Sequence, residues 1–232
     1  MLFFNIIMAA IIALVIVLIA AVKDNRLKAF IYSLPFPITA ALFATKISIN
    51  SSHIVGLLLL NLFLWSVFYL YKKLKISIIF SDFLCSIGYV VLGFIFVKLF
   101  TIGFWEASSL YFIVWMIFII RYRQIREKSK RNKLPLTIKG TTVFLIALIL
   151  LYLKSFLSGV VVTFPFSGVF AVWEVREAIY TLAGEFTKNS LAILVFFIAI
   201  KIFSQYTGYY SSIGLGWLFY IPLIFGLQKI KS

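Results

Sequence analysis

Long apolar runs dominate this chain and restrict its fold more than any other feature. The first covers residues 2–22; overall, 63% of residues are hydrophobic and only 12% are charged. Runs of this length match the hydrocarbon core of a bilayer, where a helix satisfies its own backbone polar groups. The sequence therefore predicts an all-α integral membrane protein. Run 2–22 has no basic start and no small-residue cleavage site, so we expect a retained helix and not a signal peptide.

The apolar runs predict about nine membrane-spanning helices. They cover residues 2–22, 29–45, 54–71, 77–97, 104–120, 137–153, 155–173, 190–204 and 209–227. The second, seventh and eighth runs are short, and the second and seventh each contain a Phe-Pro pair. Short interrupted spans in corresponding places are typical of discontinuous helices in transporters.

Basic residues occur mainly in every second link between the expected spans. The chain has 22 Lys and Arg against seven Asp and Glu, a net charge of +15. All but four of the 22 fall in links one, three, five and seven and in the carboxyl tail; the exceptions are Lys46, Lys98, Lys154 and Lys201. The positive-inside rule then places the amino terminus outside and the carboxyl terminus in the cytoplasm of a prokaryotic plasma membrane. Anionic membrane lipids are the expected partners of these charges, and no nucleic acid is expected.

The longest link, residues 121–139, is strongly basic. It either binds lipid headgroups or acts only as the topogenic stop that fixes orientation, and the second interpretation is favoured. Lys98 and Lys201, near the ends of their spans, are expected to snorkel to the interface.

One motif occurs twice. Residues 36–40, Phe-Pro-Ile-Thr-Ala, return as residues 164–168, Phe-Pro-Phe-Ser-Gly, with matching neighbours on both sides. Four spans, one lone span and four more spans make the second copy inverted relative to the first. We therefore expect a first repeat over residues 1–103, a linker helix and basic loop over 104–136, and a second, inverted repeat over 137–232.

Each proline removes a backbone hydrogen bond and kinks or breaks its helix. In lipid such breaks persist only where they face protein or a cavity, so the motifs are expected to meet near mid-membrane. The expected substrate-binding residues are Phe36, Pro37, Thr39, Phe164, Pro165 and Ser167. The alternative is that each proline merely kinks a packed helix.

Two acidic residues, Asp82 and Glu174, fall within or at the end of apolar runs, where a charge is costly. They are candidates for coupling transport to protons or cations. The alternative is structural: a carboxylate that reaches the interface or pairs with Arg176 or a lysine. The single cysteine and single histidine provide no metal-ligand set, so we expect no cofactor, no metal and no catalytic residues.

Three other polar residues have structural interpretations. His53 and Asn189 fall in equivalent links, and His53 is expected at the membrane interface. Asn61 lies inside an apolar run and is expected to bond across helices.

The spacing of Gly159, Phe164, Pro165 and Ala171 resembles the core of the small GlpM-like membrane proteins. In the first half the resemblance rests on Phe36-Pro37, since Ile31 stands where the glycine would be. It implies two such units fused in opposite orientations, and it implies no substrate and no catalytic residues.

These features predict a transporter or channel for a small solute or ion. The alternative is a lipid-handling protein, either a flippase-like factor or an enzyme of envelope polysaccharide synthesis. An accessory subunit is a third hypothesis. A transporter requires a pocket at mid-depth, whereas a lipid-handling protein requires a lateral opening with basic residues at headgroup level. A homo-oligomer is compatible with either.

Overall fold

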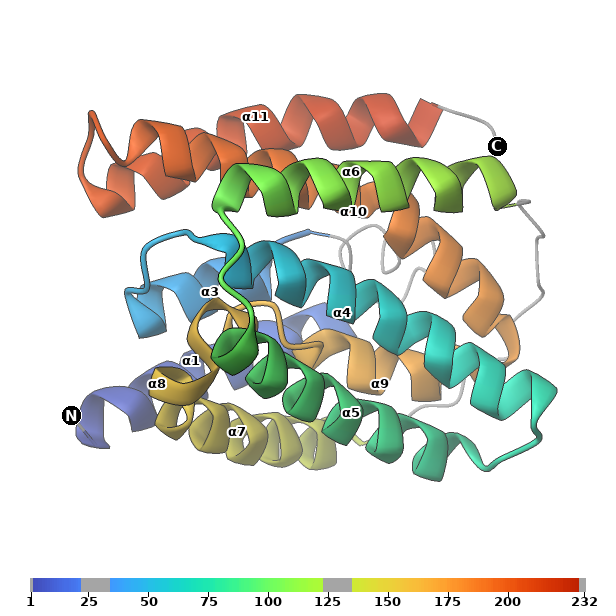
Figure 1. Ribbon diagram of the computed structural model, residues 1–232. Coiled ribbons are helices and arrows are strands. Elements are labelled where there is room, and N and C mark those ends of the chain that lie inside the picture. Colours follow the sequence, from blue (N-terminus) through green and yellow to red (C-terminus); the bar gives the residue numbers. More distant parts are fainter. Residues whose placement is uncertain (1, 22–33, 123–134, 230–232) are drawn as a thin grey trace.

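The computed structural model describes residues 2–21, 34–122 and 135–229, and within these ranges all regular structure is helical (Figure 1). The elements are α1 (Leu2–Ala21), α3 (Phe36–Thr45), α4 (Ser51–Phe68), the π-helix η1 (Tyr69–Lys73), α5 (Ile78–Leu99), α6 (Phe104–Arg121), α7 (Leu136–Tyr152), α8 (Lys154–Leu157), the 3-10 helix η2 (Ser158–Val161), α9 (Phe166–Glu174), the 3-10 helix η3 (Arg176–Ala178), α10 (Ile179–Phe203) and α11 (Tyr209–Lys229).

Five helical segments of the described chain are long and apolar enough to cross a membrane. They are Ser51–Lys73, Ile78–Leu99, Phe104–Arg121, Arg176–Phe203 and Tyr209–Lys229. A sixth is formed if Thr137–Tyr152 and Lys154–Val161 count as one span, although the two are bent by 67°. The expectation of an all-helical chain with helices long and apolar enough to cross a membrane is confirmed, whereas the nine spans in two inverted repeats stay a prediction.

Helix α10 is longer than the expected eighth span. The sequence predicted a link up to Asn189, but the helix begins at Ile179 and buries Thr187, Lys188, Asn189 and Ser190. The hydropathy pattern assigned the part of α10 before Ser190 to a link, because its polar side chains face other helices instead of lipid. The prediction that Asn189 and His53 lie in links is therefore wrong, since His53 is fully buried in the first turn of α4.

The helices form a bundle whose long axes run roughly parallel (Figure 1). Helix α1 packs on α7, α4 packs on α10, and α6 lies against both α4 and α10. Helices α4 and α5 form one neighbouring pair, and α10 and α11 form another. The bundle has two ends. We call the end where α1 begins the amino-terminal end, and the opposite end, where α11 stops, the carboxyl-terminal end.

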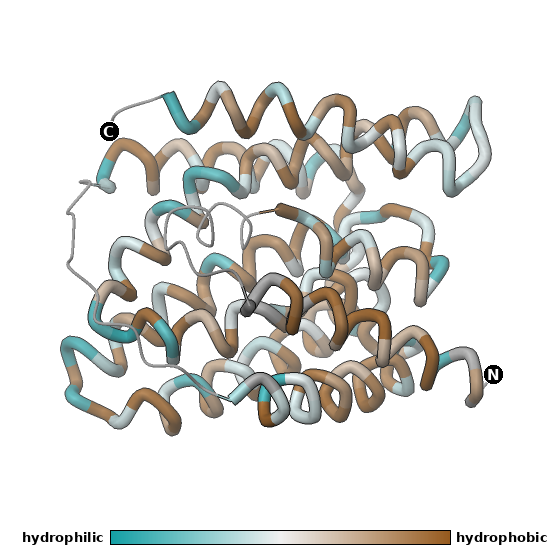
Figure 2. The backbone as a smooth tube through the Cα atoms, turned by 180° about the vertical axis from the view of Figure 1, so that it is seen from behind, coloured by the Kyte–Doolittle hydropathy of each residue, from teal (hydrophilic) through white to brown (hydrophobic). Residues whose placement is uncertain are grey.

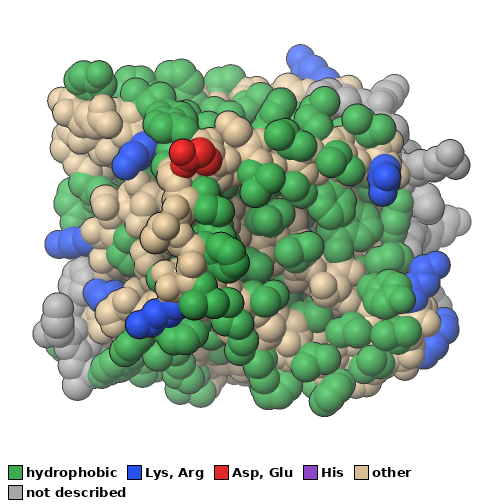
Figure 3. Space-filling model, in the orientation of Figure 1, with side chains coloured by type: hydrophobic (Ala, Val, Ile, Leu, Met, Phe, Trp, Pro, Cys, Tyr) green, Lys and Arg blue, Asp and Glu red, His purple; other side chains and the backbone are tan. Residues whose placement is uncertain are grey.

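Hydrophilic segments gather at these two ends, while the middle of the bundle is hydrophobic (Figure 2). The described basic residues of the turns at the carboxyl-terminal end are Lys72, Lys73, Lys75, Arg121, Arg176 and Lys229. Those near the amino-terminal end are Lys46, Lys98, Lys154 and Lys201. The face over α4, α5 and α6 is largely hydrophobic, with Lys and Arg toward its margins (Figure 3). This pattern is typical of a bundle embedded in a bilayer.

A polar seam joins α4, α6 and α10 inside the bundle. The Asn61 side-chain amide donates to the Tyr111 hydroxyl at 2.8 Å, and that hydroxyl donates to Ser190 Oγ at 2.6 Å. Trp65 and Trp115 donate to Thr187, at 3.0 Å to its Oγ1 and at 2.8 Å to its carbonyl oxygen. The prediction that Asn61 bonds across helices is confirmed, and the seam holds the three helices in register.

Candidate functional site

The two Phe-Pro motifs start short helices. Pro35 is the N-cap of α3 and Pro37 lies in its first turn, while Pro165 is the N-cap of α9. At these positions a missing N–H is tolerated, because the first N–H groups of a helix have no intrahelical acceptor. The prolines therefore lie at helix starts and not inside continuous helices. Upstream of α9 the break is fully visible, since η2 ends at Val161 and α9 begins at Phe166.

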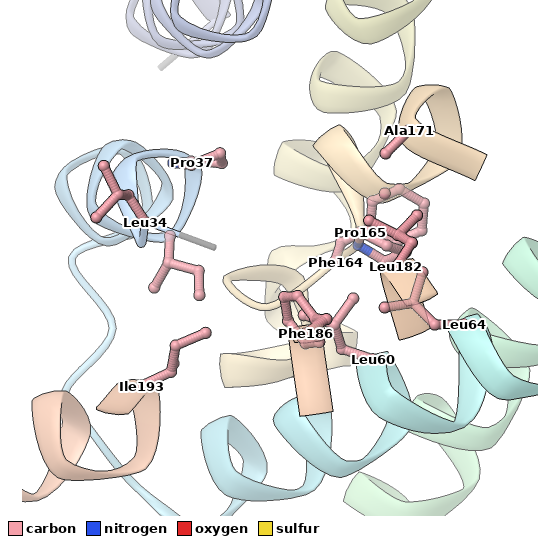
Figure 4. A pocket seen from close by; sticks show the side chains of 12 residues that line it. Leu34, Pro37, Leu60, Leu64, Phe164, Pro165, Ala171, Leu182, Phe186 and Ile193 are labelled. Atoms are coloured by element: carbon pink, nitrogen blue, oxygen red, sulfur yellow. The ribbon is translucent and has the colours of Figure 1, made fainter. Parts of the chain in front are cut away.

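The start of α3 and the break before α9 meet at one cavity between α3, α4, α9 and α10 (Figure 4). Its volume is about 40 Å³. The lining is apolar and consists of Leu34, Pro37, Ile38, Leu60, Leu64, Phe164, Pro165, Gly168, Ala171, Leu182, Phe186 and Ile193. Pro37 faces the cavity from one side, and Phe164 and Pro165 face it from the other (Figure 4). The structure thus brings together three of the six residues expected to bind a substrate.

Phe36 and Thr39 point elsewhere. The ring of Phe36 is 43% exposed and lies 4.9 Å from the ring of Trp217, and Trp217 Nε1 donates to Thr39 Oγ1 at 3.1 Å. Thr39 follows Pro37 by two residues, and positions i and i+2 do not share a helix face. The expectation that Thr39 lines the cavity is therefore wrong for this structure. The side chain of Ser167 lies outside the described part of the chain.

The Tyr89 hydroxyl fixes the break before α9. It lies 2.9 Å from the Val160 carbonyl oxygen, 3.2 Å from the Gly56 carbonyl oxygen and 2.8 Å from Thr163 Oγ1. Both Tyr89 and Thr163 are buried, and the ring of Tyr89 packs edge-on against Phe164 at 5.4 Å. A single α5 side chain therefore places a hydroxyl donor beside the Val160 carbonyl oxygen at the break, which lipid cannot satisfy.

A second polar group holds η2 against the first turn of α4. Ser52 Oγ accepts a hydrogen bond from the Gly159 N–H at 2.8 Å and donates to Ser158 Oγ at 3.1 Å. Asn50 caps α4, and its backbone N–H donates to His53 Nδ1 at 3.3 Å. A Cβ at position 159 would lie only 2.1 Å from His53 Nδ1, so only glycine fits there. This contact gives Gly159 a physical role.

The two candidate coupling residues have different surroundings. Asp82 is 4% exposed, and its Oδ1 has no hydrogen-bond partner among the described residues. Glu174 forms a buried ion pair with Lys139 of α7. The structural alternative, pairing with a lysine, therefore describes Glu174, and Lys139 belongs to α7 and not to the basic loop.

The sequence alone did not point to Tyr89, His53 or Lys139 as residues that hold the breaks in place. An aromatic hydroxyl inside an apolar run and a lysine just after Pro135 were the only available signals. In the three described ranges, no three His, Cys, Asp or Glu side chains are grouped to hold a metal ion.

Comparison of the chain with protein-family models, with curated proteins and with solved structures gives no match.

Proposed function

We propose that this protein is a transporter or channel for a small solute or ion, which passes between the half-helices α3 and α9. One observation carries the proposal: Pro37 of the first half and Phe164 and Pro165 of the second line the same cavity. Helix breaks at membrane depth are found where backbone is buried in protein or lines a passage. Discontinuous helices that meet inside a bundle are the usual binding elements of transporters.

Two inverted repeats joined by α6 belong to this proposal. Supporting evidence comes from the packing of equivalent helices on each other, α1 on α7 and α4 on α10, with α6 against both α4 and α10. Gly56 and Asn61 in α4 also match Gly184 and Asn189 in α10, with the same spacing. An axis between two inverted units would produce these contacts.

The cavity restricts the solute. A volume of about 40 Å³ exceeds that of a single water site, about 10–15 Å³, but is far smaller than most pockets for organic ligands. Helices α3 and α9 both begin at the cavity, with no side-chain cap and no acidic residue in the first turn. The positive ends of both helix dipoles therefore face it. A small neutral or anionic solute fits this environment better than a cation.

Flux measurements on purified protein in liposomes test the proposal. Osmotic light scattering with chloride, nitrate, formate, urea and glycerol gradients should show selective passage of at least one solute. Leu182→Trp, which fills the cavity from α10, is expected to lower that flux at least tenfold. Leu191→Trp on the same helix lies outside the cavity and should retain it. No flux above empty liposomes for any of these solutes, or equal flux through both variants, would contradict the proposal.

The same assay tests the proposed coupling role of Asp82. A proton gradient should accelerate uptake by the wild type. Asp82→Asn should remove this acceleration and leave the flux without a proton gradient unchanged. An unchanged response of Asp82→Asn to the gradient would make Asp82 structural.

The orientation is proposed from the segregation of basic residues: amino terminus outside, carboxyl terminus in the cytoplasm. In a Cys85→Ser background, Lys154→Cys at the amino-terminal end should react with an impermeant maleimide in intact cells. Lys73→Cys at the carboxyl-terminal end should react only after permeabilisation. The reverse pattern would invert the orientation, and labelling of both from outside would remove the inverted-repeat argument.

A lipid-handling protein is the second candidate. A lateral apolar groove between α4, α5 and α6 favours it. The groove is separate from the proline cavity and shares no lining residue with it.

A further inference from the structure

The groove between α4, α5 and α6 has a volume of about 310 Å³ and opens on the side of the bundle. Its walls come from three helices that are each long and apolar enough to span a membrane. The contributing side chains include Leu58 and Leu62 of α4, Ile95 and Phe96 of α5, and Leu110 of α6. An opening in such a place faces hydrocarbon and not water.

Tyr111 is the one hydroxyl-bearing residue of the groove lining. Its hydroxyl donates to Ser190 and accepts from Asn61 within the polar seam, so it is directed away from any occupant. The remaining lining residues are all hydrophobic. A polar solute would find no hydrogen-bonding partner in this groove, whereas a hydrocarbon chain needs none.

The length of the groove matches one leaflet. Along α5 and its C-cap it extends from Leu92 to Phe100, which is about 12 Å at the helical rise per residue. Half of a hydrocarbon core is about 15 Å. The groove reaches the amino-terminal end of the bundle at Ile102, in the connection from α5 to α6.

Basic side chains flank that end of the groove. Lys98 lies in the last turn of α5, at the level of the lining residues Phe96 and Phe100. Its side chain is exposed, and its Nζ lies 5.9 Å from the centre of the ring of Phe94, which does not line the groove. Lys201 of α10 reaches the other side of the connection, with its Nζ 5.9 Å from the centre of the Phe104 ring. The carboxylate of Glu106 lies beside Gly103, in the same connection. Two lysines and one carboxylate therefore lie at this level, and the net positive charge favours an anionic headgroup.

We propose that this groove is a binding site for one bilayer phospholipid, with an acyl chain along α5 and an anionic headgroup beside Lys98. The site takes a lipid from the leaflet at the amino-terminal end of the bundle. It is independent of the proposed transport activity, because its lining and its charges are separate from the proline cavity.

Native mass spectrometry of delipidated protein tests the site by titration with phosphatidylglycerol and with phosphatidylcholine. Wild-type protein should retain one phosphatidylglycerol in preference to phosphatidylcholine. Leu110→Trp, which fills the groove, should weaken retention at least tenfold, since loss of about two buried methylene groups has that effect. Ile113→Trp is the matched control, because Ile113 is exposed one turn further along α6 and lies outside the groove. If Leu110→Trp does not fold, Leu62→Trp fills the groove from α4.

The preference for phosphatidylglycerol over phosphatidylcholine tests the position of the headgroup. Lys98→Gln should reduce the preference for phosphatidylglycerol about fivefold, while binding of phosphatidylcholine stays unchanged. Lys154→Gln, at the same end of the bundle, should keep the wild-type preference. Equal lipid retention by the wild type, the groove-filling variant and Ile113→Trp would overturn the proposal, as would an unaltered preference in Lys98→Gln.

Discussion

Replacing Glu174 by Gln is expected to lower the free energy of unfolding by about 3–5 kcal/mol. Glu174 and Lys139 are 2% and 1% exposed, and they form an ion pair between α9 and α7. Removing the carboxylate leaves the ammonium group of Lys139 buried without its countercharge. Unfolding in mixed detergent micelles with increasing denaturing detergent measures this change.

The helix dipoles add to this effect. Lys139 lies in the first turn of α7, where the dipole is positive, and Glu174 is the last residue of α9, where it is negative. Each charge is therefore unfavourable for its own helix, and the ion pair offsets this. A variant that keeps only one of the two charges should therefore be less stable than a variant that lacks both.

A double variant and a control separate the ion pair from general damage. Lys139→Met combined with Glu174→Leu should recover most of the lost stability, because a buried pair can be replaced by apolar side chains. Glu106→Gln removes an exposed carboxylate in the first turn of α6 and should cost at most about 1 kcal/mol. Wild-type stability of Glu174→Gln would show that the pair contributes nothing.

Replacing Gly159 by Ala is expected to destabilise the protein by about 1–3 kcal/mol, the usual effect of overpacking. The added Cβ would lie 2.1–2.5 Å from three atoms of the His53 ring. That ring cannot move aside readily, since it is fully buried, bonded to Asn50 and packed 5.5 Å from Phe197. The same unfolding measurement applies.

Variants of His53 test whether its ring causes the loss of stability in Gly159→Ala. His53→Ala should be destabilising alone, and Gly159→Ala should add little in that background, because the space is then open. Gly88→Ala and Gly214→Ala are matched controls, since a Cβ at either meets no atom within 4 Å. We expect both to be neutral or stabilising by up to about 1 kcal/mol. Additive losses at positions 53 and 159 would exclude the contact as the cause.

Much of the architecture could be predicted from the sequence. Apolar runs indicate helices in a membrane because lipid cannot satisfy backbone polar groups. Prolines in two short runs predicted interrupted helices, and Pro35, Pro37 and Pro165 do lie at helix starts. The repeated motif also predicted that Pro37 and Pro165 lie close together, and both line one cavity. The axis between two inverted repeats, from which that expectation was argued, stays a prediction.

The polar half of α10 and the direction of Thr39 could not be predicted. Hydropathy reports whether a residue prefers lipid or water. A polar side chain that is buried against another helix contacts neither, so hydropathy assigns it wrongly to a link. Lys188 and Asn189 therefore resembled a link, although both are buried in α10. Thr39 seemed equivalent to Ser167 by spacing, but helix geometry turned it toward Trp217.

The sequence by itself determined the class of the protein and the positions of its helix breaks, because these depend on local composition and on proline. The tertiary structure alone decided the partners: Lys139 for Glu174, Tyr89 for the broken backbone, and His53 for Gly159. Such pairings depend on how each helix is rotated and shifted against its neighbours. Rotation and shift arise from the packing of all helices together, which no single run of residues encodes.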